Sequence, residues 1–197
     1  MLRQYPSLPS ISLQPGASYA QPSQLILERV SLDDPALNVM TDLRLVTAVV
    51  ILPGDMMSEA HRRMIRRGVR LLLVVDQDRK VLGIITASDI LGEKPMQLIA
   101  QRGIRREELL VRDVMTRQEH LEALRLDDVR SARVGHIVAT LRKAGRQHAI
   151  VVEPGSEGGH TVRGLFSATQ IARQLGVFIE TGEIARTFSE IEARLAH

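Results

Sequence analysis

The chain has 197 residues, of which 44% are hydrophobic and 25% are charged, and this composition indicates a globular rather than a disordered protein. It contains no cysteine, so disulfides, thiolate nucleophiles and thiolate-ligated metals are excluded. The formal net charge is +3, with 23 Arg against only 3 Lys. Arginine binds phosphates and carboxylates through paired hydrogen bonds. Anion binding is therefore one interpretation of this excess, and solvated helix faces are the other.

Residues 1–30 are expected to form a flexible arm. Four of the eight prolines lie within the first 22 residues, and no hydrophobic period is present there. Ordered structure is expected to begin near Gln24, where LILERV resembles a short strand. No apolar run approaches the roughly 20 residues of a membrane helix, and the N-terminus lacks a secretory signal. We therefore expect a cytoplasmic protein without a membrane anchor.

After the arm, one unit occurs twice, and the tripeptide Val39-Met40-Thr41 returns as Val114-Met115-Thr116. A short apolar strand, a helix, a continuously apolar strand, a third strand and a second helix follow in each repeat. The apolar runs LLLVVD and HAIVVE are typical of strands buried on both faces. These β-α-β-β-α elements are predicted at 49–52, 55–67, 71–76, 81–85 and 87–91, and at 123–126, 131–143, 148–153, 162–166 and 168–175.

The string GIITASD, residues 83–89, stands where a strand is predicted to end and a helix to begin. The free N–H groups and the dipole at such a junction favour an anion. Thr86 can donate a hydrogen bond to a phosphate, and Asp89 can accept hydrogen bonds from ribose hydroxyls. The alternative is structural, because T-x-x-D is also a capping box that only closes a helix end.

Repeat 2 carries the matching string GLFSATQ, residues 164–170. The V-M-T tripeptide, the β-α-β-β-α unit and this strand-to-helix turn, present twice between Val39 and Gly176, resemble the cystathionine-β-synthase (CBS) domain family. Two such domains in tandem form a Bateman module. The resemblance implies an α/β (α+β) fold in which two repeats pack about a pseudo-two-fold axis. We expect CBS repeat 1 at 31–100, CBS repeat 2 at 101–176 and an added C-terminal helix at 177–197.

The resemblance implies a non-catalytic sensor that binds AMP, ADP, ATP or S-adenosylmethionine between the repeats and requires no metal. Carried over by position, Asp89 would bind the ribose hydroxyls and Thr86 the phosphate, while Ser167 would be the phosphate-binding hydroxyl of repeat 2. Adenine would lie against residues 46–49 and 121–124. Further candidate ligand residues are Val46 and Thr47 on the adenine side, and Arg70 and His148 as phosphate partners.

Repeat 2 departs from the family pattern, because Gln170 stands where the family has a second ribose-binding Asp. A neutral amide makes weaker hydrogen bonds to a diol than a carboxylate does. We therefore expect the Asp89 site to be the better nucleotide site and the Gln170 site to be weak, altered or empty. Leu73 and Ile150 also replace a proline that is usual in the family, and the segment after each V-M-T is longer.

The resemblance further implies a homodimer and a regulated partner protein that the sequence does not identify. No metal-ligand spacing, phosphate loop or nucleophile elbow is present in the sequence, so we do not expect an enzyme. Two other hypotheses stay open. One is a ligand-free dimerisation scaffold, in which Thr86 and Asp89 only cap a helix. The other is nucleic-acid binding through the basic string at 61–70, which the 3% aromatic content disfavours.

Overall fold

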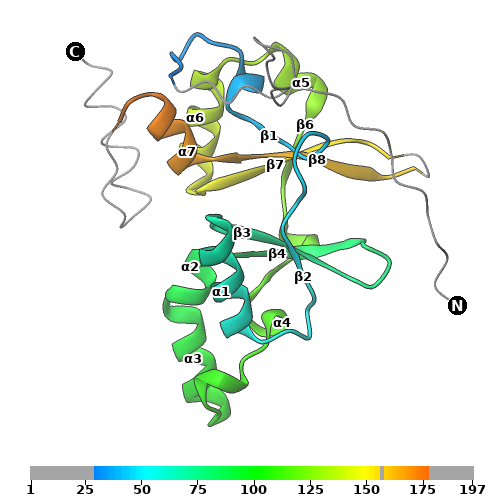
Figure 1. Cartoon of the computed structure of the whole chain (residues 1–197), viewed down its shortest axis with the longest axis vertical. Coiled ribbons are helices and arrows are strands. Elements are labelled where there is room, and N and C mark those ends of the chain that lie inside the picture. Colours follow the sequence, from blue (N-terminus) through cyan, green and yellow to red (C-terminus); the bar gives the residue numbers. More distant parts are fainter. Residues whose placement is uncertain (1–28, 156–157, 178–197) are drawn as a thin grey trace, which may run out of the picture.

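The computed structural model describes residues 29–155 and 158–177. They form two halves, each a four-stranded sheet with helices on its outer side, and the two sheets face each other across the middle of the molecule (Figure 1). In the first half, the lower one in Figure 1, the strand order is β2-β3-β4-β5. Its elements are β2 (Val50–Ile51), α1 (Met57–Arg67), β3 (Leu71–Val75), β4 (Val81–Thr86), α2 (Ala87–Leu91), α3 (Glu93–Arg102), α4 (Val111–Val114) and β5 (Thr116–Arg117).

The second half has the strand order β1-β8-β7-β6. Only the pair β6–β7 is parallel in this sheet, as β2–β3 is in the other. The two sheets therefore have the same topology, as the repeated sequence predicts. The elements of this half are β1 (Thr41–Asp42), β6 (Ala123–Arg125), α5 (Leu126–Ser131), α6 (Val134–Ala144), β7 (His148–Pro154), β8 (His160–Ser167) and α7 (Ala168–Gln174), with short 3-10 helices at Ala36–Val39, Arg106–Glu108 and Gln118–His120.

The predicted strands and helices of both repeats are confirmed, with one correction. The helix expected at 131–143 begins only at Val134, and a separate helix, α5, occupies Leu126–Ser131. Asp127 and Asp128 lie in the first turn of α5, where carboxylates interact favourably with the helix dipole. The linker between the repeats contains a helix, α3, which starts at Glu93 and is followed by Gly103 in the left-handed conformation that commonly ends a helix.

Each V-M-T tripeptide leads into a strand of the opposite sheet. Thr41 of β1 pairs with Leu165 of β8, and Thr116 of β5 pairs with Ile84 of β4. This exchange explains the glycine that opens each strand-to-helix string. A Cβ on Gly83 would lie 2.2 Å from the Thr116 carbonyl oxygen, so the crossing strand leaves no room for a side chain. Neither sheet is complete without residues from the other repeat.

Three apolar clusters hold this arrangement together. Two fill the space between each sheet and its helices, and each includes residues contributed by the exchanged segment, such as Val39 in the second half and Val114 in the first. The third lies between the sheets and contains Leu71, Leu73 and Val75. All five residues of β3 are buried, which confirms the prediction of a strand covered on both faces.

An ion-pair network anchors the exchanged strand β1 on the second sheet. Arg163 of β8 contacts both Asp42 and Glu153, and Arg44 pairs with Glu153 at 2.6 Å. The Asp42 and Arg163 side chains are only 14% and 15% exposed. Because little water reaches this pair, its loss is expected to destabilise the crossing of the two repeats.

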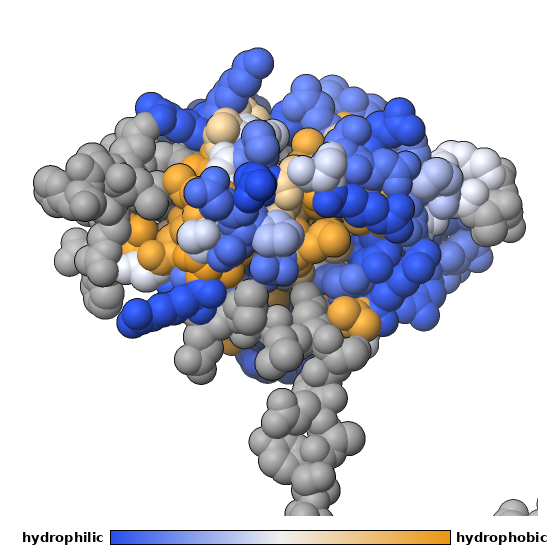
Figure 2. Space-filling view, turned by 90° about the horizontal axis from the view of Figure 1, so that it is seen from above, coloured by the Kyte–Doolittle hydropathy of each residue, from blue (hydrophilic) through white to orange (hydrophobic). Residues whose placement is uncertain are grey.

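Figure 2 shows the helical face of the second half, where apolar side chains emerge between hydrophilic ones. The arm expected at 1–30 lies almost wholly outside the described residues, and residues 29 and 30 belong to no strand. The C-terminal helix expected at 177–197 also lies outside the described residues, except for the buried Val177. Among the described residues, no helix is both long and apolar enough to cross a membrane.

Candidate ligand-binding cleft

A cavity of about 220 Å³ lies where the two halves meet. The first half contributes Thr86 and Asp89 from the β4–α2 junction. The second half contributes residues around the end of α6 and the start of β7. Its walls combine a carboxylate, a hydroxyl and basic groups with apolar side chains, which is the mixture expected of a small-ligand site. The lining includes Ile84, Thr86, Ser88, Asp89, Thr116, His120, Leu121, Glu122, Arg146, Gln147, His148 and Ile150.

Thr86 and Asp89 form a capping box at the start of α2. The Thr86 backbone N–H and hydroxyl donate to Asp89 Oδ2 at 2.8 and 2.7 Å, and the Asp89 backbone N–H donates to Thr86 Oγ1 at 3.3 Å. The helix-capping role, which was the structural alternative for the T-x-x-D string, is therefore present. Of the two Asp89 carboxylate oxygens, only Oδ2 takes part in these hydrogen bonds. Capping thus leaves the second carboxylate oxygen outside the box, and the box holds the side chain in a fixed orientation at the cavity wall.

The second half supplies the basic groups of the cleft. Arg146 pairs with Glu122 at 3.0 Å, and both residues line the cavity. Burial, together with the positive charge of Arg70, lowers the pKa of His148 to about 4. The imidazole is therefore neutral near pH 7. An anion placed in the cleft would favour its protonated form, because an opposite charge nearby stabilises the charged state.

The corresponding turn of repeat 2 has different chemistry. Ser167 Oγ accepts from the Gln170 backbone N–H at 3.5 Å, and Gln170 Oε1 accepts from the Thr41 hydroxyl at 3.5 Å. Gln170 thus contacts the exchanged strand β1. Ser167 and Gln170 are not among the residues that line the 220 Å³ cavity.

The strand register identifies which residues of the two repeats correspond. Leu71 pairs with Thr86, and His148 pairs with Ser167. His148 is therefore the counterpart of Leu71, and by the same register Arg70 is the counterpart of Gln147. A titratable imidazole at this position exists only in repeat 2.

Of the predicted site residues, the structure brings Thr86, Asp89 and His148 into one cavity, together with Leu121 from the predicted adenine segment. Arg70 is not among the residues that line this cavity, but its positive charge contributes to the lowered pKa of His148. Val46 lies in the loop before β2 and is 39% exposed. Thr47 lines a different cavity, beside α1.

Sequence reasoning missed Arg146, Gln147 and Thr116 as lining residues. They line the same cavity as Asp89 because strand β5 crosses to the first sheet and the end of α6 lies opposite the β4–α2 junction. Arg146 directly follows Gly145, a glycine of the kind that ends helices, and so it stands in the turn that leads into β7. That position is the sequence signal that could have identified it as a lining residue. Among the described residues, no group of three or more His, Cys, Asp or Glu side chains could hold a metal ion.

Comparison with known proteins agrees with this architecture. Residues 36–95 match the model of the CBS domain family. An uncharacterized conserved protein from Pyrococcus horikoshii superposes with a TM-score of 0.54 at 21% identity, covering 78% of this chain and 100% of that one. The CBS domain pair of protein MJ0100, solved in complex with 5′-methylthioadenosine and S-adenosyl-L-methionine, superposes with a TM-score of 0.50 at 18% identity, covering 74% and 98%.

The chain therefore contains a CBS domain and has the fold of a tandem CBS-domain pair, a Bateman module. In sequence, no curated protein is significantly similar to it.

Proposed function

We propose that this chain is a non-catalytic regulatory module that binds an adenine nucleotide or an adenosyl ligand in the cleft at Thr86 and Asp89 and signals its occupancy to a partner protein. The observation that carries the proposal is the convergence of Asp89, Arg146 and His148 on one cavity, although they come from different repeats. The similar CBS pair of MJ0100 was crystallised with two adenosyl compounds, which supports this ligand class.

Each group has a role that follows from its chemistry. Asp89 Oδ1 accepts hydrogen bonds from the ribose hydroxyls, while Oδ2 keeps its place in the capping box. Arg146 stands where a phosphate or a carboxylate would meet positive charge, and the neutral His148 imidazole can hydrogen-bond the same anion and become protonated beside it. Leu121 and Ile150 offer the apolar surface against which an adenine ring can pack.

The turn at Ser167 and Gln170 is proposed to be the weaker site or an empty one. It has an amide in place of the carboxylate, and Gln170 is already engaged by Thr41. The ligand would thus bind at the turn of Thr86 and Asp89 and not at the equivalent turn of repeat 2. Binding there bridges the two halves, so ligand affinity and the mutual orientation of the halves are coupled.

We further propose that the module acts as a homodimer. Ile65 on α1, Leu91 on α2 and Met96 on α3 are 68%, 62% and 60% exposed. Large apolar side chains grouped on the helices of one half are typical of a surface that another protein covers. A second molecule of this chain is the proposed occupant.

The second candidate function is a ligand-free dimerisation scaffold, which the observed capping box favours. A thermal-shift experiment with 5′-methylthioadenosine, S-adenosylmethionine, AMP, ADP and ATP separates the two candidates. A ligand at about 100 times its dissociation constant adds roughly 2.7 kcal/mol, which raises the melting temperature by a few degrees. Under the scaffold hypothesis no compound shifts it.

Asp113 offers a matched control for the capping role of Asp89. It caps the start of α4 by accepting from the Leu110 backbone N–H at 2.9 Å, and it does not line the 220 Å³ cavity. Both Asp89→Ala and Asp113→Ala should lower the melting temperature of the free protein. Only Asp89→Ala should abolish the shift produced by ligand. If the two variants respond to ligand alike, Asp89 is a helix cap and nothing more.

A further inference from the structure

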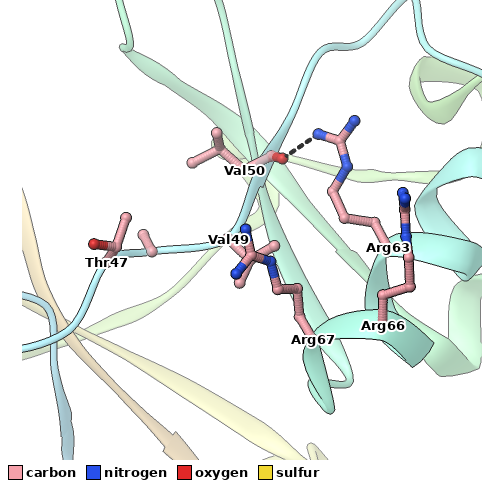
Figure 3. Close-up of a pocket in the computed structure, with 7 residues that line it drawn as sticks. Thr47, Val49, Val50, Arg63, Arg66 and Arg67 are labelled. Atoms are coloured by element: carbon pink, nitrogen blue, oxygen red, sulfur yellow. Dashed lines mark hydrogen bonds between the residues drawn. The ribbon is translucent and has the colours of Figure 1, made fainter.

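A larger cavity, of about 730 Å³, lies between the segment Thr47–Val50 and α1 (Figure 3). One wall is the strand segment Thr47–Val50, and the other is the last two turns of α1, which present Arg63, Arg66 and Arg67. These arginines are spaced i, i+3 and i+4, so they share one face of the helix. The described lining contains no acidic residue. Arginines are therefore the charged residues of its described lining, and it shares no lining residue with the cleft at Asp89.

The three arginines differ in how far they are already neutralised. Glu59 accepts from Arg66 at 2.8 Å and from Arg63 at 3.4 Å, and Asp55 lies 3.9 Å from Arg63. Glu59 also pairs with Arg62, so it is shared among three guanidinium groups. Arg67 has no ion-pair partner within residues 29–155 and 158–177. Figure 3 shows its guanidinium group extended from α1 towards Val49. The cavity thus holds more guanidinium charge than the protein itself balances.

The strand that forms the other wall of the cavity contributes a backbone hydrogen-bond donor, the Val50 N–H. Strand β2 is the edge of its sheet, and Leu73 of β3 donates to the Val49 carbonyl at 3.1 Å. In this parallel register Val50 faces the opposite side, where its carbonyl accepts from Arg63 Nη1 at 2.7 Å. Because the N–H and C=O of one strand residue point to the same side, the Val50 N–H is directed towards the arginines. Backbone N–H groups beside guanidinium groups are suited to phosphate oxygens.

The second half lacks this feature at the corresponding place. The cavity between β6 and α6 measures only about 70 Å³. Counting from the helix-ending glycines Gly68 and Gly145, the counterparts of Arg63, Arg66 and Arg67 are Thr140, Lys143 and Ala144. Thr140 and Ala144 line the smaller cavity and Lys143 does not. The arginine cavity is thus a property of one repeat and not a consequence of the shared fold.

We propose that this cavity is a second ligand site, which takes a condensed phosphate, meaning an anion with two or more linked phosphoryl groups. Three guanidinium groups spread around one hollow can each engage a different phosphoryl group of such a chain. The volume lies within the range of small-ligand pockets. A concave hollow suits a small anion better than the convex backbone of a DNA duplex, and the 3% aromatic content leaves little for base stacking.

The test is isothermal titration of the full chain with inorganic tripolyphosphate, alone and after saturation with AMP. Arg67→Ala should weaken tripolyphosphate binding about tenfold or more, since each charged hydrogen bond contributes substantially. Arg62→Ala is the matched control, because Arg62 lies on the same helix, pairs with Glu59 at 3.1 Å and does not line the cavity. It removes the same charge, and we expect it to leave the affinity nearly unchanged. Asp89→Ala should also leave it unchanged.

The AMP arm distinguishes a free condensed phosphate from the phosphate tail of a nucleotide. The site is assigned to the free anion if AMP leaves the affinity for tripolyphosphate unchanged and if Arg67→Ala leaves the affinity for ATP unchanged. An Arg67-dependent gain of ATP over AMP assigns it to a nucleotide tail. The proposal is overturned if tripolyphosphate does not bind, if Arg62→Ala and Arg67→Ala weaken it equally, or if duplex DNA binds with the same dependence on Arg67.

Discussion

The β4–α2 junction of the first half presents Asp89 to the cleft between the halves, whereas the β8–α7 junction of the second half presents Gln170 to the exchanged strand β1. Both junctions begin with a glycine over which a strand of the other repeat passes, and both place a hydroxyl at the start of the helix. The backbone requirements of the fold are therefore met twice. The carboxylate that can bind a ligand is present at only one of the two junctions, as Asp89, and the other junction has the neutral Gln170.

The polar side chains of the cleft divide between the halves in a complementary way. Asp89 comes from the first half and His148 from the second, yet they line the same cavity. The arginine cavity belongs to the first half alone. Positions whose residue type the backbone requires, such as the junction glycines, are therefore the same in both repeats. Positions that only present a side chain to a cavity differ between the repeats. The predictions that follow test this division.

The largest effect is expected at the crossing of the strands. Gly83→Ala would place a Cβ 2.2 Å from the Thr116 carbonyl oxygen, a backbone atom that cannot move without displacing β5. We expect a loss of about 3 kcal/mol or more in the free energy of unfolding, measured by urea denaturation. Gly164→Ala should cost less, because its nearest contact is the flexible Met40 side chain, at 2.7 Å. Gly54→Ala is the control, since nothing lies within 4 Å of that Cβ. Equal effects at all three glycines would contradict the strand-crossing explanation.

The next largest effect is expected from the ion pair that anchors β1. Asp42→Ala leaves Arg163 largely buried beside Glu153 alone, so we expect a loss of about 2–3 kcal/mol by chemical denaturation. The position corresponding to Asp42 in the other exchanged strand is Arg117, which is exposed. Arg117→Ala should change stability by less than about 0.5 kcal/mol. A large effect of Arg117→Ala would mean that the two crossings are held in the same way.

A smaller effect is expected from pH, through His148. Its pKa is about 4 in the folded chain and near 6.5 when unfolded. Between these two pH values the imidazole is therefore protonated in the unfolded chain but stays neutral in the folded chain. Stability is therefore lost as pH falls from about 6.5 towards 4, by about 2 kcal/mol near pH 5. His148→Asn should remove this component, as measured by melting temperature against pH. In the complex, an anionic ligand favours the imidazolium, so ligand affinity should rise as pH falls. A pH profile identical in the variant would show that His148 does not carry the effect.

Much of the fold is predictable from the sequence, because its signals are local. The continuous apolar run at 71–76 predicts a buried strand, and Gly68 and Gly145 mark helix ends through their left-handed backbone. The turn at Thr86 and Asp89 is recognisable for the same reason. The exchange of β1 and β5 is not predictable in this way, because a two-residue strand has no periodicity and its partner is fixed only by packing.

The rest of the cleft depends on that exchange. Arg146 and Gln147 belong to repeat 2 in sequence but face Asp89 of repeat 1 in space. The arginines of α1 stand out in the sequence as a basic string, but only the structure shows that Arg63, Arg66 and Arg67 line a cavity while Arg62 does not. Local patterns thus identify the groups, and tertiary structure decides which of them act together.

The most direct test of the central claim is the binding stoichiometry of 5′-methylthioadenosine or AMP, measured by isothermal titration on wild type, Asp89→Ala and Gln170→Ala. The account predicts one strong site per chain, which disappears in Asp89→Ala and persists in Gln170→Ala. Two equal sites, or equal losses in the two variants, would contradict the division of chemistry between the halves.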